Sequence, residues 1–151
     1  MLRSFAALVF GRAIALPIAA DVLLTLPRVA GGVLLIRFGW SKFPTPQWFI
    51  EDVGRLGFPA PTFFAWAAVL SEVFCSALLA LGLATRLTAL MVVCTMFVAA
   101  FVQKADAALW EKLPSLFFLL NAYFAMVLGS GRFGLDELIR RRWLVKAQVP
   151  G

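Results

Sequence analysis

Residues 61–83 read PTFFAWAAVLSEVFCSALLALGL, an apolar run in which Ser71 and Glu72 are the first strongly polar pair. An apolar helix of about 20 residues crosses the hydrocarbon core of a bilayer, so this segment is long enough to span a membrane. Similar apolar runs cover residues 22–40, 87–102 and 114–128. The last two are short and must borrow flanking residues to span. We therefore expect four transmembrane helices.

The composition supports an integral membrane protein. Of the 151 residues 62% are hydrophobic and 15% are charged, and the mean hydropathy is +0.91. A soluble chain of this length would need more polar surface to cover its core. Short links between the runs force neighbouring helices to run antiparallel. The sequence predicts an all-α, antiparallel four-helix transmembrane bundle over residues 22–136, preceded by a segment 1–21 and followed by a basic tail 137–151.

The 14 basic residues are distributed unevenly over this topology. The side of the termini carries Arg3, Arg12, Arg28, Arg86, Arg132, Arg140, Arg141, Arg142 and Lys146. The other side carries Lys42, Arg55, Lys104 and Lys112, and Arg37 lies inside a span. Because Lys and Arg favour the cytoplasmic side, we expect both termini in the cytoplasm. The net charge of +6 then indicates contact with the lipid bilayer and its anionic headgroups, not a nucleic-acid partner.

Residues 1–21 admit two interpretations. An amphipathic helix in the cytoplasmic interface would place Arg3 and Arg12 on its polar side. A cleaved signal peptide is the alternative, and we favour the helix because Arg12 interrupts the apolar stretch and Pro17 follows it.

The longest loop, residues 43–61, is predicted on the outer side. It contains a stretch, residues 47–56, with the pattern of a short amphipathic helix. The loop is expected either to cap the outer end of the bundle or to remain a solvated loop.

Four short motifs occur in order along the chain. They are Arg28-x-x-x-Gly32 with Gly39-x-x-Lys42, Ser71-Glu72 followed by small and apolar residues up to Arg86, Lys112-x-Pro114, and Gly129-Ser130-Gly131-Arg132-Phe133-Gly134-Leu135-Asp136. Together, over about residues 28–136, they resemble the DoxX family of small four-span membrane proteins. The resemblance implies a multi-pass protein of the bacterial cytoplasmic (inner) membrane.

The same resemblance implies a role close to redox chemistry. Members of the family are similar to the membrane subunit of a thiosulfate:quinone oxidoreductase or are linked to oxidative-stress complexes. We therefore expect a protein that supports quinone-linked redox chemistry beside a redox enzyme subunit, with quinone as the cofactor to test. A non-catalytic scaffold that recruits a partner through the loop 43–61 and the basic tail is the alternative, and a homo-oligomer stays open. Histidine, the commonest haem and zinc ligand, is absent, so no metal site is expected.

Glu72 is the residue on which a working site would depend. An ionisable side chain within a span costs roughly 3 kcal/mol or more unless it is paired or hydrated, so it should face the interior. We predict a buried polar cluster of Arg37, Glu72 and Asn121, with Ser71 and Ser41 nearby, that binds a quinone headgroup or relays a proton. The same cluster could instead only fix helix register, with Arg37 extending to the headgroups.

Three further features have a simpler explanation beside a functional one. Cys75 and Cys94 have matching depths and could pair, but a buried Cys usually packs as a small apolar residue. Phenylalanines of the last two spans could line a quinone slot but more often contact lipid: Phe97, Phe101, Phe117, Phe118 and Phe124. Arg132 and Asp136 are spaced for an ion pair at the start of a helix.

Overall fold

The computed structural model describes residues 18–147. Most of the predicted N-terminal segment 1–21 lies outside this range. The described residues form α2 (Ile18–Trp40), α3 (Gln47–Arg55), α4 (Pro61–Leu70), η1 (Ser71–Cys75), α5 (Ser76–Leu81), α6 (Thr85–Val98), η2 (Ala99–Gln103), α7 (Leu109–Leu128) and α8 (Leu135–Ala147), where η marks a π-helical turn.

Four helical segments are long and apolar enough to cross a membrane, as the sequence predicted. They are Asp21–Trp40, Pro61–Leu81, Thr85–Gln103 and Leu109–Leu128. The second joins α4, η1 and α5 without a break, and the third joins α6 and η2. The described chain is all-helical, so the predicted fold class is confirmed. The third and fourth spans do borrow flanking residues.

The fourth span begins earlier than the sequence suggested. The apolar run of this span begins at Pro114, but α7 starts at Leu109 and Pro114 lies inside the helix. Lysines from both sides of the preceding loop close this end of the helix. Lys104 Nζ donates to the carbonyl of Glu111 at 2.8 Å, and Lys112 Nζ donates to the carbonyl of Ala105 at 2.6 Å. These contacts hold an extra helical turn ahead of the proline.

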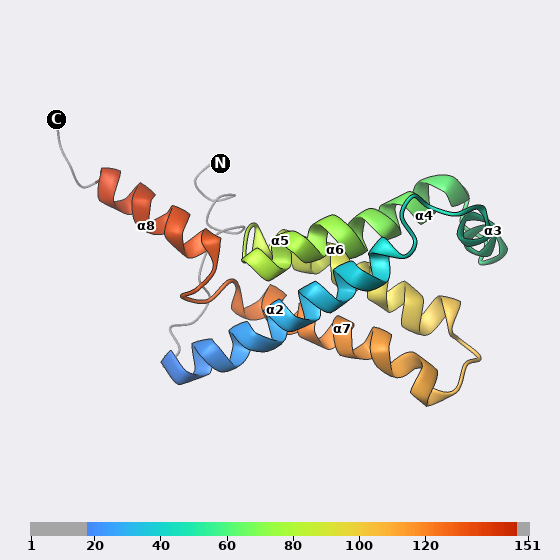
Figure 1. Ribbon diagram of the computed structural model, residues 1–151, viewed down its shortest axis with the longest axis horizontal. Coiled ribbons are helices and arrows are strands. Elements are labelled where there is room, and N and C mark those ends of the chain that lie inside the picture. Colours follow the sequence, from blue (N-terminus) through green and yellow to red (C-terminus); the bar gives the residue numbers. More distant parts are fainter. Residues whose placement is uncertain (1–17, 148–151) are drawn as a thin grey trace.

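The spans lie side by side, with α3 at one end of the bundle and α8 at the other (Figure 1). The end where α2 starts and α7 stops is called the Asp21 end. The opposite end, where α2 stops and α3 lies, is called the Lys42 end. Two glycines bring α2 close to the second span, because a Cβ on Gly32 would lie 2.8 Å from Ala80 Cβ and one on Gly39 would lie 2.7 Å from Glu72 Cβ. Small residues allow this close approach of helices in membranes.

The interior holds two apolar clusters. The larger lies between α2, α5, α6 and α7 and contains Leu35, Leu79, Ala89, Val92, Met96, Phe118, Ala122 and Ala125. The smaller lies under α3, where Phe49 and Val53 pack on residues of α4 and η1. The helix predicted at 47–56 is therefore confirmed, and it caps the Lys42 end instead of forming a solvated loop. Of the five phenylalanines, only Phe118 is in the core; the other four are about half exposed, as lipid contact requires.

Hydrogen bonds and an ion pair between polar side chains join the segments at the Asp21 end. Asp136 Oδ1 accepts from the Ala84 N–H at 2.7 Å, and Oδ2 accepts from the Thr85 N–H at 2.9 Å and the Thr85 hydroxyl at 2.7 Å. Asp136 thus caps α6, whose first N–H groups have no partner within the helix. Arg132 pairs with Asp21, Nε to Oδ2 at 3.1 Å. The expected Arg132–Asp136 ion pair is therefore wrong, because each side chain has a nearer partner on another segment.

Candidate functional site

Glu72 lies in the π-helical turn η1, in the middle of the second span. The wider turn ends where Ser76 donates its backbone N–H, and its hydroxyl at 3.3 Å, to the carbonyl of Ser71. Such π-turns inside α-helices are often found at functional sites. The turn directs Glu72 against α2 at Gly39, and the Glu72 side chain is only 6% exposed. The prediction that Glu72 faces the interior is confirmed.

The partner of Glu72 is Lys42, not Arg37. Lys42 Nζ donates to Glu72 Oε1 at 2.9 Å and to Oε2 at 2.7 Å. The same ammonium lies 5.3 Å from the ring centre of Phe49, a favourable cation–π geometry, so α3 covers the pair. Lys42 reaches Glu72 because it follows Gly39 just beyond the end of α2. Among the described residues, none forms a hydrogen bond or ion pair with Arg37, which is exposed.

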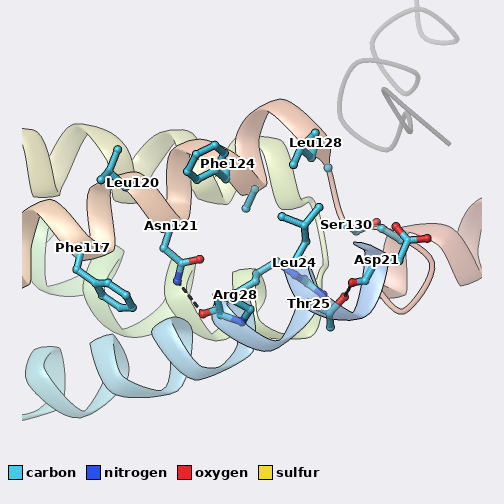
Figure 2. Close-up of a pocket in the computed structure, with 14 residues that line it drawn as sticks. Asp21, Leu24, Thr25, Arg28, Phe117, Leu120, Asn121, Phe124, Leu128 and Ser130 are labelled. Atoms are coloured by element: carbon cyan, nitrogen blue, oxygen red, sulfur yellow. Dashed lines mark hydrogen bonds between the residues drawn. The ribbon is translucent and has the colours of Figure 1, made fainter. Parts of the chain in front are cut away.

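Asn121 does not join this pair. Its Nδ2 donates to the carbonyl of Pro27 at 2.8 Å, nearer the Asp21 end (Figure 2). A Cβ on Gly31 would meet the Asn121 amide, whereas one on Gly39 would meet Glu72. Those two glycines are eight residues, or about 12 Å, apart along α2. The predicted cluster of Arg37, Glu72 and Asn121 is therefore wrong as geometry. Of the expected neighbours, Ser71 is beside Glu72, while Ser41 donates to the carbonyl of Phe38.

A cavity of about 340 Å³ opens beside Glu72. Its walls come from α3, α4, η1, α6 and η2 and are mostly apolar, including Phe49, Phe58, Phe64, Met91 and Val98. Ligand pockets commonly have volumes of about 300–1,000 Å³, with apolar walls and a few polar groups. The cavity has that character, and Ser71 and Glu72 are its buried polar residues.

The Ser71 hydroxyl is the second polar group of this cavity. Ser71 is 6% exposed, and its Oγ makes no hydrogen bond to the protein beyond a weak interaction with the Cys75 thiol. A buried hydroxyl without a good partner is costly, so a ligand acceptor that meets it would be stabilised. Ser71 and Glu72 together therefore offer a donor and an acceptor side by side.

The two cysteines are free thiols. Cys75 is half-buried and packs against the main core, as the simpler interpretation of its sequence context predicted. Cys94 is exposed and lines the Glu72 cavity. No disulfide joins Cys75 to Cys94 in this structure, so the redox pair stays a hypothesis.

A groove of about 230 Å³ lies between α2 and α7 at the Asp21 end. Figure 2 shows Asn121, Thr25 and Asp21 along it, with Leu24 of α2 and the leucines and phenylalanines of α7 around them. The two cavities are separate, since no residue lines both.

Sequence reasoning missed Lys42 and the Asp21 end. The signal for Lys42 was present in Gly39-x-x-Lys42, because a glycine on the interior face places the following turn beside the next helix. Arg28 belonged to the same motif. It is buried, and its guanidinium donates to the carbonyl of Leu79 at 2.7 Å. Nothing local in the sequence indicates that acceptor, which lies 51 positions away.

Four apolar helices around a mostly apolar cavity with two buried polar residues define a small multi-pass membrane protein. The family model described as DoxX matches residues 23–105, more than half of the chain, and the chain belongs to the DoxX family. It is also 29% identical over 134 residues to an uncharacterised membrane protein of Mycobacterium tuberculosis, an alignment that covers 76% of this chain and 80% of that protein. No solved structure matches it.

Proposed function

We propose that this chain binds a quinone headgroup in the Glu72 cavity and so supports the redox chemistry of a partner enzyme in the membrane. One observation carries the proposal: two buried polar side chains, Ser71 and Glu72, meet in a cavity whose other walls are mostly apolar. A quinone has an apolar ring and two carbonyl oxygens, and it dissolves in the bilayer. Its chemistry therefore fits both parts of the cavity.

Ser71 and Glu72 meet two requirements of quinone reduction, a hydrogen bond to a carbonyl oxygen and a group that delivers a proton. The Ser71 hydroxyl can donate to a quinone carbonyl, and Glu72 can hold a proton beside it. Reduction to a quinol consumes two electrons and two protons. In this proposal the redox cofactor of a partner enzyme supplies both electrons, and water at the Lys42 end supplies both protons, which pass one after the other through Glu72. Lys42 holds the Glu72 side chain in place through two hydrogen bonds and, because its own side chain is 27% exposed, links Glu72 to the surface at the Lys42 end.

Entry from the membrane is consistent with the walls of the cavity. Phe64 and Met91 line it and are 37% and 42% exposed on the surface that faces lipid. A hydrophobic ligand can therefore approach between α4 and α6 without crossing water. With the proposed location in a bacterial cytoplasmic membrane and the termini inside, the cavity would lie toward the outer leaflet.

The test is a titration of a short-chain quinone against the purified protein in mild detergent. Glu72→Gln and Ser71→Ala are expected to weaken binding roughly tenfold each, the effect of one lost hydrogen bond to a polar or charged group. Arg37→Gln is the matched control, because it also removes a charge but lines neither cavity. Binding that is unchanged in Glu72→Gln and Ser71→Ala would reject the cavity as the quinone site.

A scaffold role without quinone is the alternative. It predicts no quinone binding by the wild type and a co-purified partner enzyme that is lost when α3 or α8 is altered. Both helices lie at the ends of the bundle, where a peripheral protein could reach them (Figure 1).

A further inference from the structure

We propose that the groove between α2 and α7 binds one phospholipid with an ammonium headgroup, such as phosphatidylethanolamine, from the leaflet at the Asp21 end. This site is separate from the Glu72 cavity and does not depend on the proposed quinone function. The argument rests on the walls of the groove, its level in the bilayer, its charge pair and one incompletely bonded amide.

The long walls of the groove suit an acyl chain. They are formed by apolar side chains of α2 and α7: Leu24, Phe117, Leu120, Phe124 and Leu128. Phe117, Leu120 and Phe124 are each about half exposed, so the groove opens on the surface that faces lipid. A chain lying here would bury apolar area that is already out of water, so van der Waals packing, not the hydrophobic effect, would hold it.

The polar residues place the groove at the level of the headgroups. Asp21 and Leu128 are the boundary residues of the first and fourth spans, and the groove reaches both. Asp21, Thr25 and Arg28 occupy the first two turns of the first span, and all three line the groove. One end therefore belongs to the polar interface and the other to the hydrocarbon.

The charges at the polar end match a zwitterion. The buried Asp21 carboxylate lines the groove and can accept from an ammonium group. Arg132 lies just outside the groove, after the lining residue Gly131. Its Nε contacts Asp21 Oδ2 at 3.1 Å, and its side chain, which is 40% exposed, offers further N–H groups to a phosphate at the mouth of the groove. An ammonium and a phosphate on one headgroup thus meet an acceptor and a donor on one ion pair.

The amide of Asn121 offers a further contact deeper in the groove. Its Nδ2 donates to the carbonyl of Pro27, and among the described residues nothing donates to its Oδ1. An open acceptor in apolar surroundings favours a ligand that brings a polar hydrogen or an ordered water. The glycerol region of a lipid lies between headgroup and chains, as Asn121 lies between Asp21 and Phe117 in Figure 2.

The first experiment tests the groove. Purified, delipidated protein is mixed with phosphatidylethanolamine, and bound lipid is counted by native mass spectrometry. Leu120→Trp fills the groove without touching a polar contact, and we expect it to lose the bound lipid. Leu113→Trp is the matched control, because it lies two turns away on α7, is 54% exposed against 52% for Leu120, and does not line the groove. Equal lipid binding by both variants would overturn the site.

The second experiment tests the headgroup and uses the wild type. Phosphatidylethanolamine, phosphatidylcholine and phosphatidylglycerol are added at equal concentrations. We expect a roughly tenfold preference for the first, because only its ammonium can form an ion-paired hydrogen bond with Asp21, whereas phosphatidylcholine has no donor and phosphatidylglycerol offers neutral hydroxyls beside a net negative charge. Asp21→Asn should remove that preference. Equal binding of the three lipids, or a preference for the anionic phosphatidylglycerol, would overturn the ammonium assignment.

Discussion

At the scale of single residues, the Lys42–Glu72 pair has the largest consequence for the chain. One ammonium serves both carboxylate oxygens inside the bundle, so neither charge can be removed alone without leaving the other unpaired. A broken buried pair destabilises strongly, whereas a pair replaced as a whole often does not. This asymmetry allows a structural role for Glu72 to be separated from a functional one.

Replacing Lys42 tests this separation. We expect Lys42→Met to lower the free energy of unfolding by about 2 kcal/mol, less than for a fully buried pair because Lys42 is partly exposed. The double variant Lys42→Met, Glu72→Gln should recover most of that loss and still bind quinone about tenfold more weakly than the wild type. Thermal unfolding in detergent, followed by tryptophan fluorescence, measures the first effect, with Arg37→Gln as control. A double variant no more stable than Lys42→Met would contradict the pairing.

Helix geometry explains which residue assignments succeeded from sequence. The cost of a charge in the membrane correctly predicted that Glu72 is buried. The predicted partner, Arg37, was wrong because the prediction rested on the depth of Arg37 in the membrane and not on the face of α2 from which it extends. Gly39 touches Glu72, and successive residues of a helix are about 100° apart, so Arg37 points about 200° away from that contact. The interior face was already marked by Gly32 and Gly39.

At the scale of elements, the contact between α2 and η1 positions the site. It depends on the absence of a side chain at Gly39. We expect Gly39→Ala to destabilise the protein by about 2 kcal/mol, because the new methyl group must push α2 away from the backbone of η1. It should also weaken quinone binding, since Lys42 moves with α2.

Gly54→Ala is the control for this substitution. A Cβ there would meet only the ring of Pro61, at 3.3 Å, and alanine favours the helix α3. The unfolding midpoints and the quinone affinities of Gly39→Ala and Gly54→Ala are compared with those of the wild type. If Gly39→Ala were as stable as the wild type, the close packing of α2 on η1 would be refuted.

Helix α8 should respond to acid. Hydrogen bonds from Arg140, opposed by burial and aided by Arg141, lower the pKa of Glu137 from 4.5 to about 2. Because this pKa is lower in the folded state, the stabilisation is complete above about pH 4.5 and is lost as the pH falls toward 2. Hydrogen exchange of the amides of residues 135–147, corrected for intrinsic rates, should show loss of protection at pH 3. Glu137→Gln should show weak protection of these amides at pH 6 as well. If protection in this variant still fell between pH 6 and pH 3, the acid response would have to come from a group other than Glu137.

Among the elements, the number and approximate positions of the spans and the cap helix could be predicted, because hydropathy and helical periodicity indicate them directly. The π-turns could not, since nothing in their sequences, SEVFC and AAFVQ, distinguishes them from the α-helix before them. Their geometry arises from how one span packs against its neighbours. The early start of α7 was missed for a related reason: the lysine contacts across its loop are tertiary.

At the scale of the whole molecule, the number of spans places the start of α2 and the end of α7 on the same side. The excess of basic residues at that side predicts that it is cytoplasmic. A green fluorescent protein fused after residue 151 should therefore fluoresce, and alkaline phosphatase inserted in the loop 43–46 should be active. The opposite pattern would reverse the orientation and place the Glu72 cavity toward the cytoplasmic leaflet.

The overall architecture was accessible from sequence because the bilayer restricts a chain with four apolar runs to few arrangements. The cavities were not, because each is the space left between helices from distant parts of the chain. The groove between α2 and α7 is lined by residues from the ranges 21–28 and 117–131. No periodicity within either range indicates that the two lie beside each other with a space between them.

The cap that Asp136 places on α6 has a consequence for biogenesis. During synthesis the turn after α5 leaves the ribosome long before Asp136 does, so the first N–H groups of α6 must wait for a residue 51 positions later. The second and third spans can enter the bilayer as a hairpin, but they are fastened only when the last segment arrives. A nascent chain that ends before this aspartate would therefore expose uncapped N–H groups at the start of α6. A quality-control protease could recognise that feature and so distinguish an incomplete product from a finished one.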